Sequence, residues 1–360
     1  MIIRTRKAAF SGLALVASAT LLAGCASAPS SSTATTAIDF KPCMVSDSGG
    51  FNDKSFNQLG YEGLQAAAKE LGVTPITVES NAETDFAPNL QSLADQGCDL
   101  IVSVGFLLSA PTVEAAKANP DIEYVLIDDA ADNDFDGTRD APNIEPLLFN
   151  TAQAAFLAGY AAASSTQSGI VGTFGGINIP PVSIFMDGFK QGVDFYNTEN
   201  SKSVKLLGWD GKDGSFTGGF EANDGARQIA QSIIDQGADI ILPVGGPIYQ
   251  SAAAAIEGSG KEIALLGVDA DITQTDPSVA SIVMTSILKN INVAVHDSVV
   301  AASKGTFSSD PYVATLDNGG VGLAGLTNFS SWIPQDLQSK LDDLKAKIIS
   351  GEVKVTSFLD

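Results

Sequence analysis

The sequence predicts an α/β protein with two lobes, each a parallel sheet flanked by helices, and a ligand cleft between the lobes. Short apolar runs alternate with amphipathic segments, which is typical of parallel sheets with right-handed crossovers. The second half of the chain also repeats the first: DQGCDLIVSVG at 95–105 returns as DQGADIILPVG at 235–245. In each copy an Ala-rich helix and an apolar strand follow, ending in Asp128 and Asp269. Because the roughly 320 residues expected to be ordered exceed what one core usually supports, two domains are expected.

Residues 1–24 have the pattern of a secretory signal peptide. Basic residues precede an apolar run at 13–22, which is too short for a stable membrane span. The ending LAGC resembles the lipobox of bacterial lipoproteins, in which Cys25 becomes the lipidated first residue. An ordinary secretory signal with a chance cysteine is the alternative. Residues 25–38, rich in Ser, Thr and Ala, are expected to be a flexible tether to the extracytoplasmic face of the cell membrane.

The charge balance limits the partners. The chain has 42 acidic and 20 basic residues, a formal net charge of −22 at pH 7. Nucleic acid and anionic lipid are poor partners for such a surface, so membrane contact is expected through the lipid anchor only. No P-loop, zinc-spaced cluster or G-x-S-x-G elbow occurs in the sequence. No cofactor is therefore expected, and the protein is expected to be a monomer.

Residues 38–72 predict a strand, a loop and a helix. The strand ends in Asp47, at the carboxyl edge where α/β proteins bind ligands. Ser55 and Gln58 match a capping box, so the helix is expected to begin after Ser55. Phe56, in the first helical turn, is expected to face the same space as Asp47.

The alternation of strands and helices continues beyond this unit. Strands are expected at about 76–78, 100–104 and 123–127, with helices at about 85–96, 111–118 and 288–302. The chain is expected to cross between lobes near Asn150, Met284 and Thr306. Lobe 1 then holds 39–150 and about 284–306, and lobe 2 holds 151–283 and about 307–360.

Two cysteines remain once Cys25 is assigned to lipid. Cys43 and Cys98 each stand at the start of an apolar strand run, and the first and third strands of doubly wound sheets are usually neighbours. We expect a disulfide between them, which an extracytoplasmic compartment permits. Two buried free thiols are the alternative.

The strand ends of two facing lobes converge on one cleft. Asp47 and Asp128 would then lie on one side and Asp269 on the other, with Phe56 opposing Phe185. Aromatic faces flanked by carboxylates suit a flat ligand with hydrogen-bond donors, such as a base attached to a sugar. In the alternative interpretation the rings belong to the core and the carboxylates cap turns.

The run DSGGFNDKSFNQ, residues 47–58, resembles the opening signature of the basic membrane protein family, the nucleoside-binding lipoproteins of bacterial ABC transporters. The resemblance extends from about Phe40 to about His296. It implies a type I periplasmic-binding-protein fold, a purine nucleoside as ligand, and delivery to an ABC permease by hinge closure. Two departures concern the identity of the base: Asn52 stands where Asp is common, and no Gln follows 270–272 at the expected place.

The resemblance also implies individual contacts. Phe185 would stack on the base, Gly245 and Gly246 would lie in a ribose-side loop, and Lys289 would join Asp269. The expected ligand-binding set is Asp47, Ser48, Phe56, Asn57, Asp128, Phe185, Gly245, Gly246, Asp269 and Lys289.

Three alternatives remain open. A sugar or autoinducer binder would have the same fold. A nucleoside-cleaving enzyme could use Asp128 and Asp269 as a carboxylate pair, but two aromatic rings and a lysine favour binding, so no enzyme is expected. The loop 132–137 matches the first half of a calcium loop. Arg139 and Asn143 occupy the positions that should be apolar and Glu, so a solvated acidic loop without metal is expected.

Overall fold

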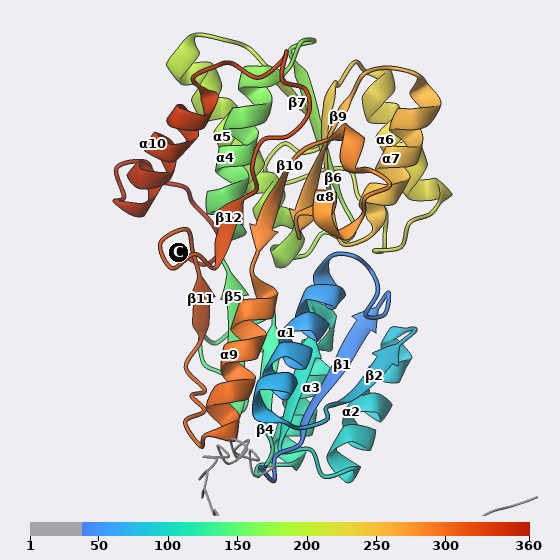
Figure 1. Ribbon diagram of the computed structural model, residues 1–360, viewed down its shortest axis with the longest axis vertical. Coiled ribbons are helices and arrows are strands. Elements are labelled where there is room, and N and C mark those ends of the chain that lie inside the picture. Colours follow the sequence, from blue (N-terminus) through green and yellow to red (C-terminus); the bar gives the residue numbers. More distant parts are fainter. Residues whose placement is uncertain (1–37) are drawn as a thin grey trace, which may run out of the picture. The chain divides into compact units, whose positions relative to one another are not determined.

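The computed structural model describes residues 38–360. The expected signal peptide, Cys25 and nearly all of the tether lie outside these residues. The described chain forms two six-stranded sheets flanked by helices (Figure 1). The strand orders are β11-β5-β4-β3-β1-β2 and β12-β10-β9-β8-β6-β7. Five strands of each sheet therefore follow the same doubly wound order, as the internal repeat predicts.

The first sheet comprises β1 (Pro42–Ser48), β2 (Ile76–Ser80), β3 (Leu100–Val104), β4 (Glu123–Ile127), β5 (Ile144–Phe149) and β11 (Tyr312–Ala314). The second comprises β6 (Ile170–Gly175), β7 (Lys205–Leu207), β8 (Ile240–Val244), β9 (Ala264–Asp269), β10 (Val283–Lys289) and β12 (Val321–Leu323). All pairings are parallel except that of β10 with β12.

The helices fall into two sets. Those of the first lobe are α1 (Phe56–Leu71), α2 (Phe86–Asp95), α3 (Ser109–Ala118) and α9 (Ile291–Ser303). Those of the second are α4 (Thr151–Ser165), α5 (Pro180–Asn200), α6 (Asp224–Asp235), α7 (Ile248–Ser259), α8 (Ile272–Thr275) and α10 (Leu337–Ile349). Short 3-10 turns lie at Glu83–Asp85, Phe106–Leu108 and Ala280–Ile282. Among the helices of residues 38–360, none combines the length and the hydropathy of a membrane span.

Alternation along the strands assigns the two faces of each sheet. In β1, Met44 belongs to the apolar cluster that includes Leu64 of α1 and Val295 of α9. Its neighbour Val45 joins the cluster under α2 and α3 on the other face. Since both faces are covered, the central strands are apolar throughout, and every residue of β3 and β8 is buried.

The chain passes between the sheets three times, and two passages come later than expected. The first follows β5 at Asn150. The second follows Lys289, because β10 pairs with β9 before the chain enters α9, which packs against α1 (Figure 1). The third lies between β11 and β12. The boundaries expected near Met284 and Thr306 are therefore wrong, since β10 completes the second sheet and β11 extends the first.

The first two passages have the same local geometry. Asn150 and Asn290 each precede a helix, with φ and ψ of −78° and 65° and of −78° and 58°. Their backbone N–H groups donate to the carbonyl oxygens of Ala314 and Gly320, which flank the third passage. The three connecting segments are thus tied together by backbone hydrogen bonds.

Helix α1 begins where expected, but the capping box is wrong. Ser55 precedes the helix and makes no side-chain cap bond. The carboxylate of Asp53 instead accepts hydrogen bonds from the backbone N–H groups of Ser55, Asn57 and Gln58, at 3.0, 2.9 and 3.0 Å. The hydroxyl of Ser55 is thereby available to the opposite lobe.

Cys43 and Cys98 form a disulfide with a Cα–Cα distance of 5.9 Å. The bond ties the loop before β3 to β1, and these two strands are neighbours in the first sheet. It closes a sequence separation of 55 residues. A loop of that length corresponds to on the order of 4 kcal/mol of stabilisation in a chain-entropy estimate.

Candidate functional site

A pocket lies between the strand ends of the two lobes. It holds about 590 Å³ of empty space, part of it open to solvent, which is within the range of small-molecule sites. Every residue of the expected ligand-binding set lines it. The other lining residues are Asp53, Gly105, Phe106, Leu107, Ile179, Pro181, Val182, Phe220, Val244, Pro247 and Val268. Most of this second group is apolar.

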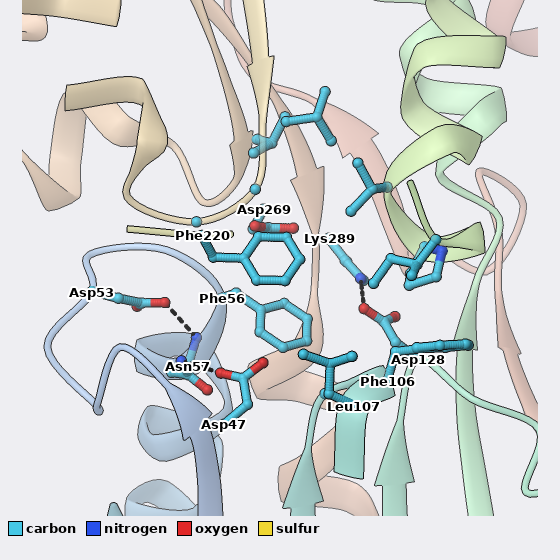
Figure 2. A pocket seen from close by; sticks show the side chains of 18 of the residues that line it. Asp47, Asp53, Phe56, Asn57, Phe106, Leu107, Asp128, Phe220, Asp269 and Lys289 are labelled. Atoms are coloured by element: carbon cyan, nitrogen blue, oxygen red, sulfur yellow. Dashed lines mark hydrogen bonds and ion pairs between the residues drawn. The ribbon is translucent and has the colours of Figure 1, made fainter. Parts of the chain in front are cut away.

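Asp47 and Asn57 form one polar pair at the pocket wall (Figure 2). The Asn57 Nδ2 donates to Asp47 Oδ1 at 2.8 Å. Burial raises the pKa of Asp47 to about 8, although the bond from Asn57 opposes this. Asp47 is therefore largely protonated at neutral pH and can donate as well as accept. The buried Oδ1 of Asn57 has no hydrogen-bond partner among the described residues.

Lys289 is the one basic residue among those that line the pocket. Its ammonium pairs with Asp128 and lies 4.8, 5.1 and 5.9 Å from the ring centroids of Phe56, Phe149 and Phe185. The aromatic faces add cation–π attraction to the ion pair. The side chain is only 2% exposed. A cation so buried needs this pairing, because an isolated charge there would be strongly unfavourable.

The expected pairing of Lys289 with Asp269 is not the one observed. The ion pair is made to Asp128, because β10 leads towards the first lobe and brings the ammonium to the end of β4. Asp269 accepts instead from the Ser55 hydroxyl, at 3.0 Å. Burial raises the pKa of Asp269 to about 6, and the nearby charge of Lys289 opposes that shift.

The two strand-end aspartates occupy equivalent positions in the two lobes. Asp128 has φ of 73° and Asp269 has φ of 66°. Both therefore lie in the left-handed region, which Asp tolerates better than most residues with a side chain. This turn directs each carboxyl group into the pocket (Figure 2).

The predicted aromatic pair is only part of the aromatic lining. Phe56 and Phe185 lie around the Lys289 ammonium, and Phe185 is 2% exposed. A further ring, Phe220, projects from the loop between β7 and α6 towards the same space as Phe56 (Figure 2). Phe220 was not among the residues predicted from the sequence. The signal available was a long Gly-rich connection with three aromatic residues at 209, 216 and 220, which has no counterpart in the first half.

The lobes contact each other across the mouth of the pocket. Thr275 donates from its hydroxyl to the carbonyl oxygen of Lys54 at 2.8 Å, and the Lys54 ammonium lies 3.3 Å from Asp276. Ser55 adds hydrogen bonds to Asp269 and to the carbonyl oxygen of Val268. These contacts join segments more than 200 positions apart and link the two lobes directly.

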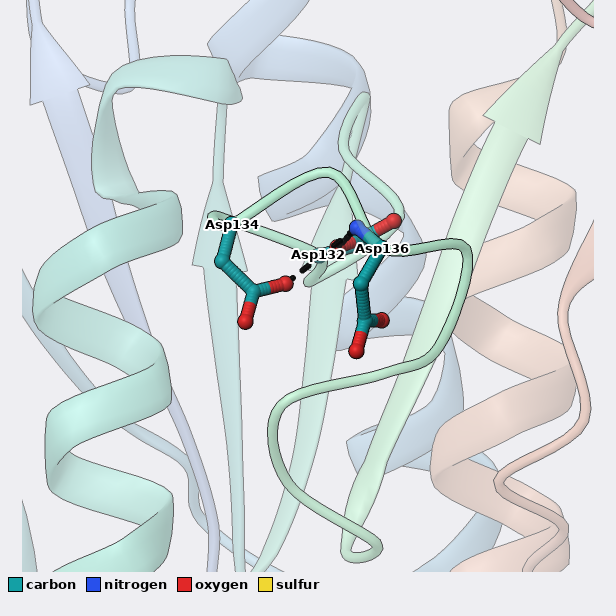
Figure 3. Close-up of side chains that lie close together, drawn as sticks. All are labelled: Asp132, Asp134 and Asp136. Atoms are coloured by element: carbon teal, nitrogen blue, oxygen red, sulfur yellow. Dashed lines mark hydrogen bonds between the residues drawn. The ribbon is translucent and has the colours of Figure 1, made fainter.

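The acidic loop outside the pocket gathers three carboxylates, Asp132, Asp134 and Asp136 (Figure 3). Backbone N–H groups within the loop donate to Asp132 and Asp134. Arg139 and Asn143, the two residues that depart from a calcium loop, make hydrogen bonds to the backbone outside the carboxylate cluster. Arg139 donates to the carbonyl oxygen of Ile144, and Asn143 donates to carbonyl oxygens at the end of α3 and beyond.

This architecture, two like lobes joined by three segments with a pocket between them, is that of type I solute-binding proteins. A solved ABC transporter solute-binding protein from Aeropyrum pernix K1 superposes with a TM-score of 0.77 at 27% identity, over 89% of this chain and 94% of that one. A second, from Conexibacter woesei DSM 14684, gives 0.66 at 23% identity over 89% and 99%. The fold thus defines a two-lobed solute-binding protein.

The family is shown by the sequence comparison. The model of the Bmp family, described as ABC transporter substrate-binding protein PnrA-like, matches residues 40–357, and the chain belongs to this family. It is 31% identical to the ABC transporter nucleoside-binding protein BmpA of Lactococcus lactis subsp. cremoris, over 98% of this chain and 99% of that protein. Basic membrane protein A of Borreliella burgdorferi is 28% identical over 86% of each.

The raised pKa of Asp47 predicts a pH-dependent stability. The folded state holds this proton up to about pH 8, whereas the ordinary pKa of an aspartate is 3.8. Stability is therefore lost as pH rises from about 4 to about 8, by at most about 1.4 kcal/mol per pH unit from this group. Asp47→Asn removes the titration, so the stability of the wild type relative to the variant should fall over that window. Urea unfolding at pH 5, 6, 7 and 8 measures the free energy of unfolding of both proteins. The prediction would be contradicted if this free energy changed with pH by the same amount in the wild type and in the variant.

Proposed function

We propose that this protein captures nucleosides, with purine nucleosides preferred, outside the cytoplasm and delivers them to the permease of an ABC transporter. The observation that carries the proposal is the pocket with two projecting rings, Phe56 and Phe220, beside three buried strand-end carboxyl groups. Aromatic rings bind a base by stacking on it, and carboxyl groups accept hydrogen bonds from its donors or from those of a sugar. The name of the Lactococcus lactis relative supports the same ligand class.

The base would lie at the side of the pocket formed by Asp47, Phe56 and Asn57. The unpartnered amide oxygen of Asn57 is an acceptor for a donor on the ligand. The protonated carboxyl of Asp47 offers a donor next to it. A purine has donors and acceptors on adjacent positions of one edge, which such a pair can match.

The sugar would lie towards Asp269 and Lys289. The Asp269 carboxylate can accept from sugar hydroxyls, since it holds one hydrogen bond from the Ser55 hydroxyl. The Lys289 ammonium has three donors, and its pair with Asp128 leaves others for a hydroxyl. These two residues come from the second sheet, whereas the base-side pair comes from the first lobe, Asp47 from β1 and Asn57 from α1.

Capture would proceed by hinge closure. A ligand that contacts both lobes stabilises the closed arrangement selectively, and the three connecting segments supply the hinge. The asparagines before α4 and α9 have the same backbone geometry and absorb the rotation at equivalent points of the repeat. A permease partner would then recognise the closed form.

The proposal includes anchoring through Cys25, consistent with relatives named lipoprotein and basic membrane protein. Cys25→Ser should move the mature protein from the membrane fraction to the soluble one, with unchanged ligand affinity. Fractionation of cells with both forms is the measurement. A wild-type protein found wholly in the culture medium would refute the anchor and leave the binding site untouched.

Experiment can distinguish nucleoside capture from two other functions, the binding of a sugar or autoinducer and the cleavage of a nucleoside. A sugar or autoinducer binder would shift in thermal stability with a pentose or another small polar ligand. A nucleoside-cleaving enzyme would release free base during incubation. A thermal-shift screen of nucleosides, bases and pentoses, followed by chromatography of the incubated mixtures, distinguishes all three.

The site assignment predicts opposite patterns for sugar-side and base-side variants. Asp269→Ala should weaken nucleoside binding by about 1 to 3 kcal/mol, because buried sugar hydroxyls lose their acceptor, with little effect on a free base. Phe56→Ala and Phe220→Ala should weaken base and nucleoside alike, by about 1 to 3 kcal/mol. Calorimetric titration with guanosine, adenosine, inosine and their bases tests this, and the exposed Asp235→Ala is the control. Asp269→Ala with wild-type nucleoside affinity would overturn the assignment.

The contacts at the mouth predict a different, ligand-independent effect. Lys54→Ala and Thr275→Val remove contacts between the lobes, and neither residue is among those that line the pocket. Each should weaken all three nucleosides by the same factor, about twofold to tenfold, mainly through faster release. Stopped-flow dissociation rates measure this, with exposed Lys202→Ala as control. A change in the ranking of the nucleosides would show that these residues act on the ligand itself.

A further inference from the structure

Phe220 is placed in the pocket by a segment that extends the second sheet at its carboxyl edge. The backbone N–H groups of Thr217 and Gly218 donate to the carbonyl oxygens of Gly175 and Gly176, at 3.0 and 2.9 Å. The Thr217 hydroxyl in turn donates to the carbonyl oxygens of Gly176 and Gly219. The chain leading to Phe220 is thus bonded directly to the end of β6.

The ring of Phe220 rests on two glycines. A Cβ on Gly176 would lie 2.5 Å from Cε1 of Phe220, and one on Gly245 would lie 2.8 Å from its Cδ1. Gly176 directly follows β6 and Gly245 directly follows β8, which are neighbours in the sheet. The backbone N–H of Gly176 also donates to the carbonyl oxygen of Val244, just before Gly245. The two glycines therefore form one surface beneath the ring.

The reason for a glycine differs between the two positions. Gly245 has φ of 143°, a conformation that side chains rarely adopt, so its backbone alone favours glycine. Gly176 does not have a positive φ. Its backbone would accept alanine, and the objection to a side chain is the space taken by Phe220 and by the carbonyl oxygen of Gly219, 2.9 Å from the added Cβ.

We propose that Gly176 is a positioning residue of the ligand site, which sets the place of the Phe220 ring by leaving room for it at the end of β6. The inference rests on the proposed function in one respect, that Phe220 contacts the base. With a methyl group at 176 the ring moves away from the strand ends and into the space that the base would fill. The absence of a side chain at Gly176 therefore sets the width of the space that is available to a flat ligand.

Gly219 provides a matched control. It lies one residue before Phe220 and does not have a positive φ, and a Cβ added to it would meet no atom within 4 Å. Gly219→Ala makes the same chemical change in the same loop without filling the space beneath the ring. It should leave nucleoside affinity within twofold of the wild type.

A double-mutant cycle tests the contact between Gly176 and the ring. Gly176→Ala should weaken guanosine and inosine binding at least tenfold in calorimetric titration. In the Phe220→Ala background the same substitution should weaken binding by a clearly smaller factor, because the ring is gone and only the carbonyl oxygen of Gly219 remains within 3 Å of the added methyl group. An equal loss in both backgrounds would overturn the proposal, since the glycine would then act on something other than the ring.

A second readout uses no ligand. Thermal unfolding is measured for the wild type, the two single variants and the double variant. Gly176→Ala should lower the melting temperature less in the Phe220→Ala background than in the wild type. If Gly176→Ala does not fold alone, recovery of folding in the double variant supports the proposal, and failure of both overturns it. If the wild type binds no nucleoside, the proposed function fails, while the stability cycle still decides on Gly176.

Discussion

The ion pair of Lys289 with Asp128 is the interaction on which the arrangement of the site depends. It joins the end of β10 in the second sheet to the end of β4 in the first, directly before the chain passes into α9. A cation with 2% exposure is tolerable there only because a carboxylate and three aromatic rings surround it. The pair therefore fixes the two lobes next to the pocket and keeps one cation among its carboxyl groups.

That single cation faces several buried acids. Asp47, Asp53 and Asp269 also line the pocket, and burial raises the pKa of each. The chain offsets this cost with hydrogen bonds: from Asn57 to Asp47, from the first turn of α1 to Asp53, and, across the cleft, from Ser55 to Asp269. An anion in this pocket would meet negative charge that is not compensated, because the acidic residues of the lining outnumber its one cation.

Each lobe contributes one feature of the repeat to the site and also a loop that departs from the repeat. The repeat supplies a strand-end aspartate in a left-handed turn on both sides, at Asp128 and Asp269. The departures are the loop that carries Phe220 in the second lobe and the loop containing Lys54 in the first. One loop adds an aromatic face to the pocket and the other adds contacts at its mouth. The irregular connections thus add Phe220 to the pocket lining and a contact between the lobes, while the strands hold these connections in place.

Sequence patterns alone predict the two-lobed fold, the internal repeat and a pocket that gathers Asp47, Asp128 and Asp269, because strand-end positions in parallel sheets converge at one edge. The family resemblance added Ser48, Asn57, the glycines and Lys289. The contacts that individual side chains make emerge only in the folded chain. Lys289 pairs with Asp128, Ser55 bonds across the cleft while Asp53 caps α1, and Phe220 enters from a loop outside the repeat. These outcomes depend on distances between segments far apart in the chain, and local sequence patterns carry no information about such distances.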